Sequence, residues 1–99
     1  MVGWVYAFES PSMPGLVKIG ATKRDPAKSL WEANSNDEWR LPDYSIAWAV
    51  NVEDPFASKR AIHALLAARR TRPRHDFFRA TAEEARQVAM VLGLFSAME

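Results

Sequence analysis

Residues 3–20 read GWVYAFESPSMPGLVKIG, and their pattern predicts two strands joined by a loop. A run of β-branched and aromatic residues is followed by a loop with two prolines and a glycine, and then by a run that alternates. Two strands joined by so short a loop pair antiparallel, because a parallel pair needs a long crossover. That pairing would bring Tyr6 and Lys18, each two or three residues from a glycine, to one patch of the sheet. We expect the function to lie at this patch.

The rest of the chain predicts three helices and a third strand. Asp25-Pro26 and Asp54-Pro55 each predict a helix start, because Asp accepts hydrogen bonds from free N–H groups and Pro at the first helical position loses none. Thr81 to Glu84 forms a capping-box pattern. The expected strands are at residues 2–8, 16–22 and 44–52, and the expected helices run from 25 to about 36, from 54 to about 70 and from 81 onward. Residues 76–79 are expected to form either a very short strand or an extended segment that buries Phe77 or Phe78.

This order predicts an α+β domain with a small, mainly antiparallel, three-stranded sheet in β-β-α-β-α order, flanked by helices. Alternation in the third strand should send Ile46, Trp48 and Val50 to one face. On the second long helix, the expected core stripe consists of Ala61, Ile62, Leu65 and Leu66. On the last helix, the expected core face consists of Ala85, Val88, Ala89, Leu92 and Phe95. We expect the tryptophans in the core or its lid rather than as base-stacking platforms; these are Trp4, Trp31, Trp39 and Trp48.

Length and composition set the class of protein. Ninety-nine residues form one domain, 1–99, and the 48% hydrophobic content is enough for one modest core. With no cysteine, neither a disulfide nor a thiolate metal site is possible. No apolar run has the length of a membrane span and no signal-peptide pattern is present, so we expect a soluble, cytoplasmic protein with no membrane partner.

The charge is distributed unevenly along the chain. Residues 54–79 carry seven Lys or Arg against two Asp, a local net charge of +5, whereas the first forty-nine residues carry five bases and six acids, a net of −1. This asymmetry suggests a polyanion partner on one face, and the alternative is a solvated helix and loop. The residues expected to contact nucleic acid are Arg24, Lys28, Arg69, Arg70, Arg72 and Arg74.

The GWVY and KIG motifs, followed by a helix, resemble those of the GIY-YIG nuclease superfamily. The similarity is closer to a small phage and bacterial branch, the meiotically-upregulated-gene-like endonuclease domain, in which the second motif often reads KIG. The stretches that carry this resemblance are SMPGLVKIGATKRDP at 12–26, AIHALLAARR at 61–70 and HDFFRAT at 75–81, so it covers nearly the whole chain, from residue 3 to about 84.

The resemblance implies hydrolysis of a DNA phosphodiester with Mg²⁺ or Mn²⁺ as cofactor. It assigns Tyr6 the role of helping to deprotonate the attacking water. Lys18 takes the place of the second-motif tyrosine, where it could contact a phosphate, and His63 matches the helical histidine of the branch.

Two expected helpers of this chemistry are replaced. The arginine that steadies the phosphate falls at Ser29, and the glutamate that holds the metal falls at Lys59, whose charge would repel a divalent ion. Arg24 and Lys28 would restore the lost positive charge only in part. Asp76 stands where the branch has glutamate before its FF pair, and the carboxylates of Glu9 and Glu32 are left as ligands for a displaced metal site.

The sequence therefore predicts a GIY-YIG-like DNA endonuclease scaffold with impaired cleavage. It leaves open whether this is a naturally inactive relative or an engineered inactive variant. The alternative function is a binding module without catalysis, directed at DNA or at a protein in phage–host conflict or regulation. A homodimer through the last helix, with Met90, Leu94 and Met98 at its face, is a further possibility.

Overall fold

The computed structural model describes residues 2–36, 43–71 and 76–95. Its elements, in chain order, are β1 (Gly3–Glu9), β2 (Val17–Thr22), α1 (Pro26–Asn36), β3 (Ser45–Val52), α2 (Pro55–Leu65), the short 3-10 helix η1 (Ala67–Arg69), β4 (Phe77–Phe78) and α3 (Ala82–Val91). The strands form one antiparallel sheet in the order β3-β1-β2-β4. The predicted α+β class and element order are confirmed, and the short fourth strand is present.

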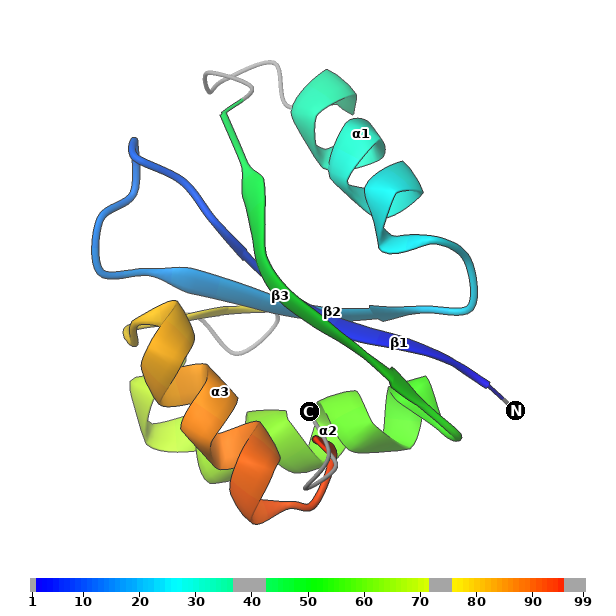
Figure 1. Ribbon diagram of the computed structural model, residues 1–99. Helices are drawn as coiled ribbons and strands as arrows, with labels where there is room; N and C mark the ends of the chain where they lie inside the picture. The colour runs from blue at the N-terminus through cyan, green and yellow to red at the C-terminus, as the bar shows by residue number, and fades with distance from the viewer. Residues whose placement is uncertain (1, 37–42, 72–75, 96–99) are drawn as a thin grey trace.

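The sheet separates two apolar clusters. Figure 1 shows α1 on one side of the strands and α2 with α3 on the other. Val5, Ala7, Val17 and Ile19 face α2 and α3 in the larger cluster. The members of the smaller cluster are Tyr6, Phe8 and Tyr44, against which Met13, Leu30, Ala33, Ala49 and Phe77 pack. Because alternate residues of a strand face opposite sides, β1 contributes to both clusters and is the centre of the fold.

All three predicted helix starts are confirmed. The Asp25 carboxylate accepts a hydrogen bond from the Ala27 N–H at 2.9 Å, and that of Asp54 accepts one from Ala57 N–H at 3.1 Å. At α3, the capping box between Thr81 and Glu84 is complete in both directions. These short polar contacts satisfy N–H groups that a helix leaves unpaired at its start.

The loop between β1 and β2 is tied to the segment that precedes β3. The hydroxyls of Ser10 and Ser12 both donate hydrogen bonds to the Asp43 carboxylate, one to each oxygen. Two turns shape the loop itself, closed by Met13 N–H to the Ser10 carbonyl at 3.0 Å and by Leu16 N–H to the Met13 carbonyl at 3.2 Å. The result is an ordered connection that holds the ends of β1 and β2 in register.

The prediction for Ile46 was wrong, while those for Trp48 and Val50 are confirmed. Ala7 pairs with Trp48 but Phe8 pairs with Ile46, so a β-bulge inserts one extra residue into β3. A bulge of one residue moves every following side chain to the opposite face. Ile46 is therefore 36% exposed on the α1 side, whereas Trp48 is buried and its indole N–H donates to the Ala82 carbonyl at 2.9 Å.

The second long helix is shorter than expected. It ends at Leu65 because the residues that follow η1 pair with β4: Arg70 forms a bridge with Phe78, and the Arg79 N–H donates to the Arg69 carbonyl at 2.7 Å. Ile62 and Leu66 supply the buried stripe, and Leu65 is 58% exposed, contrary to prediction.

Trp31 and part of the last helix are less buried than predicted. Trp31 was predicted in the core or its lid, and at 70% exposure it is not a core residue. Trp39 lies outside the described residues. On the last helix Ala85 and Ala89 are buried as predicted, but Leu92 is 36% exposed. Leu94 packs against the larger cluster, Met90 is exposed and Met98 is outside the described part, so the dimer stays a prediction.

None of the helices in residues 2–36, 43–71 and 76–95 has the length and apolar character needed to cross a membrane.

We predict that Gly20→Ala lowers the free energy of unfolding by about 1–3 kcal/mol. A Cβ at this position would lie 2.3 Å from the Tyr6 Oη and 2.4 Å from its Cζ, and the Tyr6 ring is buried and stacked on Phe8, so it has little room to move. Urea denaturation measures the loss. In a Tyr6→Ala background the same substitution should cost much less, and an equal cost in both backgrounds would contradict the clash.

Candidate functional site

The Tyr6 ring lies across β2 and is the centre of the candidate site. Tyr6 pairs with Gly20, and Phe8 with Lys18. Only a residue without a side chain leaves room for the phenol at position 20, which explains the glycine of the KIG motif. The ring stacks on Phe8 at a centroid distance of 4.2 Å, and the whole residue is 7% exposed. Its hydroxyl is thereby held at a fixed place between β2 and α1.

The surroundings of Tyr6 keep its hydroxyl protonated. Burial raises the pKa of Tyr6, a hydrogen bond with the Ser29 side chain opposes the rise, and the carboxylates of Asp76 and Glu32 raise the pKa further. A nearby arginine would lower it, because a cation favours the phenolate. With serine at position 29, only a hydrogen bond opposes the rise, so the water-activating role implied for Tyr6 loses its electrostatic support.

Lys18 lies on the same face of the sheet as Tyr6, as the predicted pairing requires. Its Nζ lies 5.9 Å from the centroid of the Phe77 ring, on the neighbouring strand β4. The ammonium group is thus placed by an aromatic face rather than by a carboxylate. Whether it contacts a phosphate remains a prediction.

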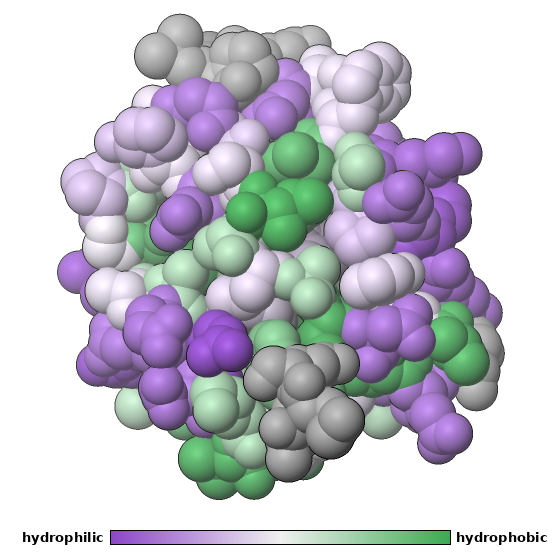
Figure 2. Space-filling model, in the orientation of Figure 1, coloured by the Kyte–Doolittle hydropathy of each residue, from purple (hydrophilic) through white to green (hydrophobic). Residues whose placement is uncertain are grey.

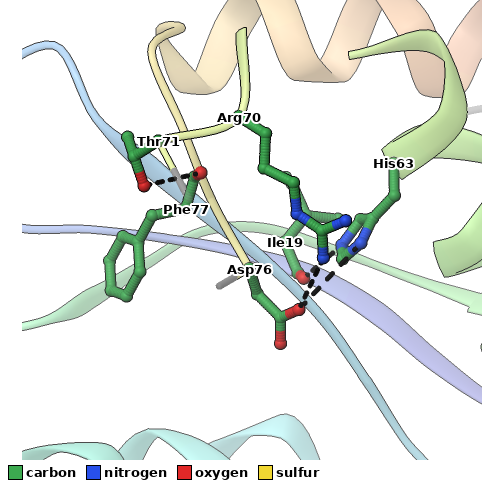
Figure 3. Close-up of polar contacts among 6 residues, drawn as sticks. All are labelled: Ile19, His63, Arg70, Thr71, Asp76 and Phe77. Atoms are coloured by element: carbon green, nitrogen blue, oxygen red, sulfur yellow. Dashed lines mark hydrogen bonds and ion pairs between the residues drawn. The ribbon is translucent and has the colours of Figure 1, made fainter. Parts of the chain in front are cut away.

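Asp76 closes the site at the start of β4. Its backbone carbonyl accepts a hydrogen bond from the Ile19 N–H at 3.0 Å, which fixes it beside the edge of β2. Its carboxylate Oδ1 lies 3.9 Å from Arg70 Nη2 and 4.0 Å from His63 Nδ1, as the dashed lines of Figure 3 show. Thr71, next to Arg70, bonds the Phe77 carbonyl through both its N–H and its hydroxyl, at 3.1 and 3.2 Å.

His63 reaches this edge from α2, on the other side of the sheet. Its Nε2 is 3.0 Å from the Ile19 carbonyl, and its side chain is 10% exposed. A carbonyl only accepts, so Nε2 carries the proton and, in the neutral ring, Nδ1 faces Asp76 without one. Burial lowers the pKa of His63. The Ile19 carbonyl and the Asp76 carboxylate raise this pKa, and the positive charges of Arg70 and Lys59 lower it further.

These groups do not suit a divalent metal ion. Within residues 2–36, 43–71 and 76–95, no group of three or more His, Asp or Glu side chains is gathered closely enough to bind one. Lys59 and Arg70 both place positive charge near His63 and Asp76. Two other carboxylates were considered for a displaced site. Glu9 pairs with Ser45 at the end of β1, and Glu32, whose charge raises the pKa of Tyr6, forms an ion pair with Arg24 at 2.5 Å.

The expected nucleic-acid contacts lie in two places. Arg24 and Lys28 are exposed at and before the start of α1, and no carboxylate of the described part of the chain pairs with Lys28. Arg69 forms an ion pair with Glu84 at 2.9 Å, at the start of α3, and Arg70 lies over the Phe78 ring at 5.7 Å as well as beside Asp76. Arg72 and Arg74 lie outside the described residues.

Asp76 is the residue that the expected site lacked. Its position before the FF pair, where the branch has a glutamate, was a signal for it, but only the structure brings its charge to both Tyr6 and His63. Ser29 was expected at the site in the place of an arginine, but its contact with Tyr6 was not predicted.

One comparison with known proteins gives a match. The model of the T5orf172 domain family matches residues 3–92. No curated protein and no solved structure matches the chain.

We predict that the folded protein loses stability as the pH falls below about 6.5, the ordinary pKa of histidine. The pKa of His63 is lower in the folded state, so the unfolded chain binds more protons in this range and acid favours unfolding. Urea denaturation at pH 7.5 and 5.5 measures the difference. His63→Gln, which keeps an N–H donor for the Ile19 carbonyl, should reduce this pH dependence, and an unchanged dependence would contradict the assignment.

Proposed function

Because the chain belongs to the T5orf172 domain family, which is related to the GIY-YIG nucleases, we propose that it is a DNA-directed protein of the nuclease type with weak or absent phosphodiester cleavage. DNA binds across the α1 side of the sheet, over Tyr6. The scaffold and the first-motif tyrosine are retained, and the groups that would support hydrolysis are replaced.

The observation that carries this proposal is the charge around Tyr6 and His63. Hydrolysis of a phosphodiester gathers negative charge on the phosphate oxygens, which family members would offset with a metal and an arginine. Here Ser29 meets the Tyr6 hydroxyl, and Lys59 and Arg70 place positive charge near His63 where a metal carboxylate is expected. At the His63 edge these two cations attract a phosphate and repel a divalent cation. The Tyr6 hydroxyl, in contrast, has the carboxylates of Asp76 and Glu32 nearby.

A second candidate function is a binding module without any cleavage, and the same observation supports it. The two differ only in residual activity, since both bind DNA through cations around the retained scaffold. A protein-directed module, by contrast, would have no affinity for DNA at low salt.

We predict that the protein leaves plasmid DNA intact, or nicks it only slowly, in Mg²⁺ or Mn²⁺. The double substitution Ser29→Arg, Lys59→Glu should raise the nicking rate by at least about 100-fold, because each expected group stabilises charge in the transition state. Gel electrophoresis of supercoiled plasmid measures the rate.

The control for this experiment is Tyr6→Phe in the double variant, which keeps the buried ring, removes only the hydroxyl, and should abolish the gained activity. If the double variant neither cuts DNA nor binds Mn²⁺ by calorimetry, the nuclease-type site is wrong. Rapid cutting by the unaltered protein would contradict the proposed impairment.

We predict that DNA affinity falls steeply with salt and does not need a divalent ion, because cationic side chains make the phosphate contacts. Fluorescence anisotropy in EDTA measures it over a series of NaCl concentrations. Lys28→Gln should reduce the slope of log affinity against log salt by about one unit. Arg86→Gln is the matched control, since Arg86 lies on α3, on the other side of the sheet, against Phe95.

A further inference from the structure

Trp31 is the most exposed large aromatic side chain among the described residues, at 70%. Tryptophan buries more apolar surface than any other residue when it is covered, so an indole left in water requires a reason. The inward face of α1 uses Leu30 and Ala33 against Tyr6, Phe8 and Tyr44, which leaves Trp31 on the outer side of the helix. The core of this protein therefore does not need the indole.

A shallow hollow in the surface surrounds Trp31. Its lining residues are Arg24, Ala27, Lys28, Trp31 and Glu32. Residues three and four apart on a helix are neighbours, so Ala27, Lys28 and Trp31 form one continuous strip. Arg24 enters from the loop before the helix and is held there by its ion pair with Glu32 at 2.5 Å. The hollow thus presents an aromatic surface bordered by Lys28 and by the Arg24–Glu32 ion pair.

This hollow adjoins the Tyr6 centre. Glu32 lines the hollow and also raises the pKa of Tyr6, while Ser29, one residue from Lys28, contacts the Tyr6 hydroxyl. Figure 2 shows that hydrophilic residues cover much of the side of the molecule that carries α1, with an apolar patch beside them over β3. A strand of DNA with a phosphate at Tyr6 would carry its next nucleotide toward α1.

We propose that the Trp31 hollow binds an unpaired base of DNA, with the indole stacked on the base and Arg24 and Lys28 on the flanking phosphates. This inference rests on the proposed DNA-directed function and specifies its substrate: DNA with a single-stranded segment. Every base has a flat face that can stack on an indole, so recognition is independent of sequence. In an intact duplex both faces of each base are already stacked on their neighbours, and an indole on a helix surface does not reach them.

The experiment compares a short poly-dT strand with a blunt duplex of equal length, by fluorescence anisotropy at low salt. Trp31→Ala should weaken binding of the single strand about fivefold or more and leave the duplex affinity unchanged. Trp31→Phe, which keeps a flat ring, should retain most of the affinity. Phe56→Ala is the matched control, because Phe56 is also a partly exposed aromatic residue but lies on α2.

The outcomes separate this inference from the proposed function. If the unaltered protein binds duplex but Trp31→Ala leaves the affinity for the single strand unchanged, the stacking site is wrong and the DNA-directed function stands. If the unaltered protein binds neither the single strand nor the duplex, the stacking site and the DNA-directed function are both wrong. A Trp31→Ala variant that binds the single strand normally but changes the molecular mass measured by light scattering would assign the indole to contact between copies. Because Trp31 is exposed, a thermal melt should confirm that the variant folds as stably as the parent.

Discussion

The packing of the Tyr6 ring across Gly20 is the constraint on which the structure depends. It requires the β1–β2 register, since a shift by one residue would turn Tyr6 to the α2 side and bring a side chain beneath it. It also gives α1 its apolar partner, because Tyr6 and Phe8 form the surface on which Leu30 and Ala33 pack. One close contact thus fixes the sheet, the position of α1 and the place of the hydroxyl at the site.

The candidate site brings buried and charged side chains together at one edge of the sheet. His63 and Asp76 meet at the edge of β2, where the Ile19 carbonyl and N–H are both satisfied, one by each of these residues. Around them Lys59 and Arg70 contribute positive charge, while Ser29 contributes only a hydroxyl, at Tyr6. Electrostatic effects of this kind need no change of fold, so the residues of a site can differ while the scaffold is kept.

Local sequence signals predicted what depends on neighbours along the chain, and failed where distant segments decide. The starts of the three helices follow from Asp25, Asp54 and Thr81, whose side chains cap the next few residues. The orientation of Ile46 depends on a bulge opposite β1, and the end of α2 depends on pairing with β4, so neither follows from a periodic pattern. At the site, Tyr6 and His63 were suggested by the family resemblance. The Tyr6–Ser29 contact and the approach of Asp76 to both residues arise only when four elements assemble.

The short strand β4 links the candidate site to the apolar core. Asp76 is followed directly by Phe77 and Phe78, and Phe78 is completely buried in the larger cluster, in contact with the His63 ring at a centroid distance of 4.8 Å. So short a strand would fray independently if only its two backbone pairs held it. Anchored by Phe78, it belongs to the same cooperative unit as the core. We therefore expect the polar edge around Ile19 to open together with the core rather than separately from it.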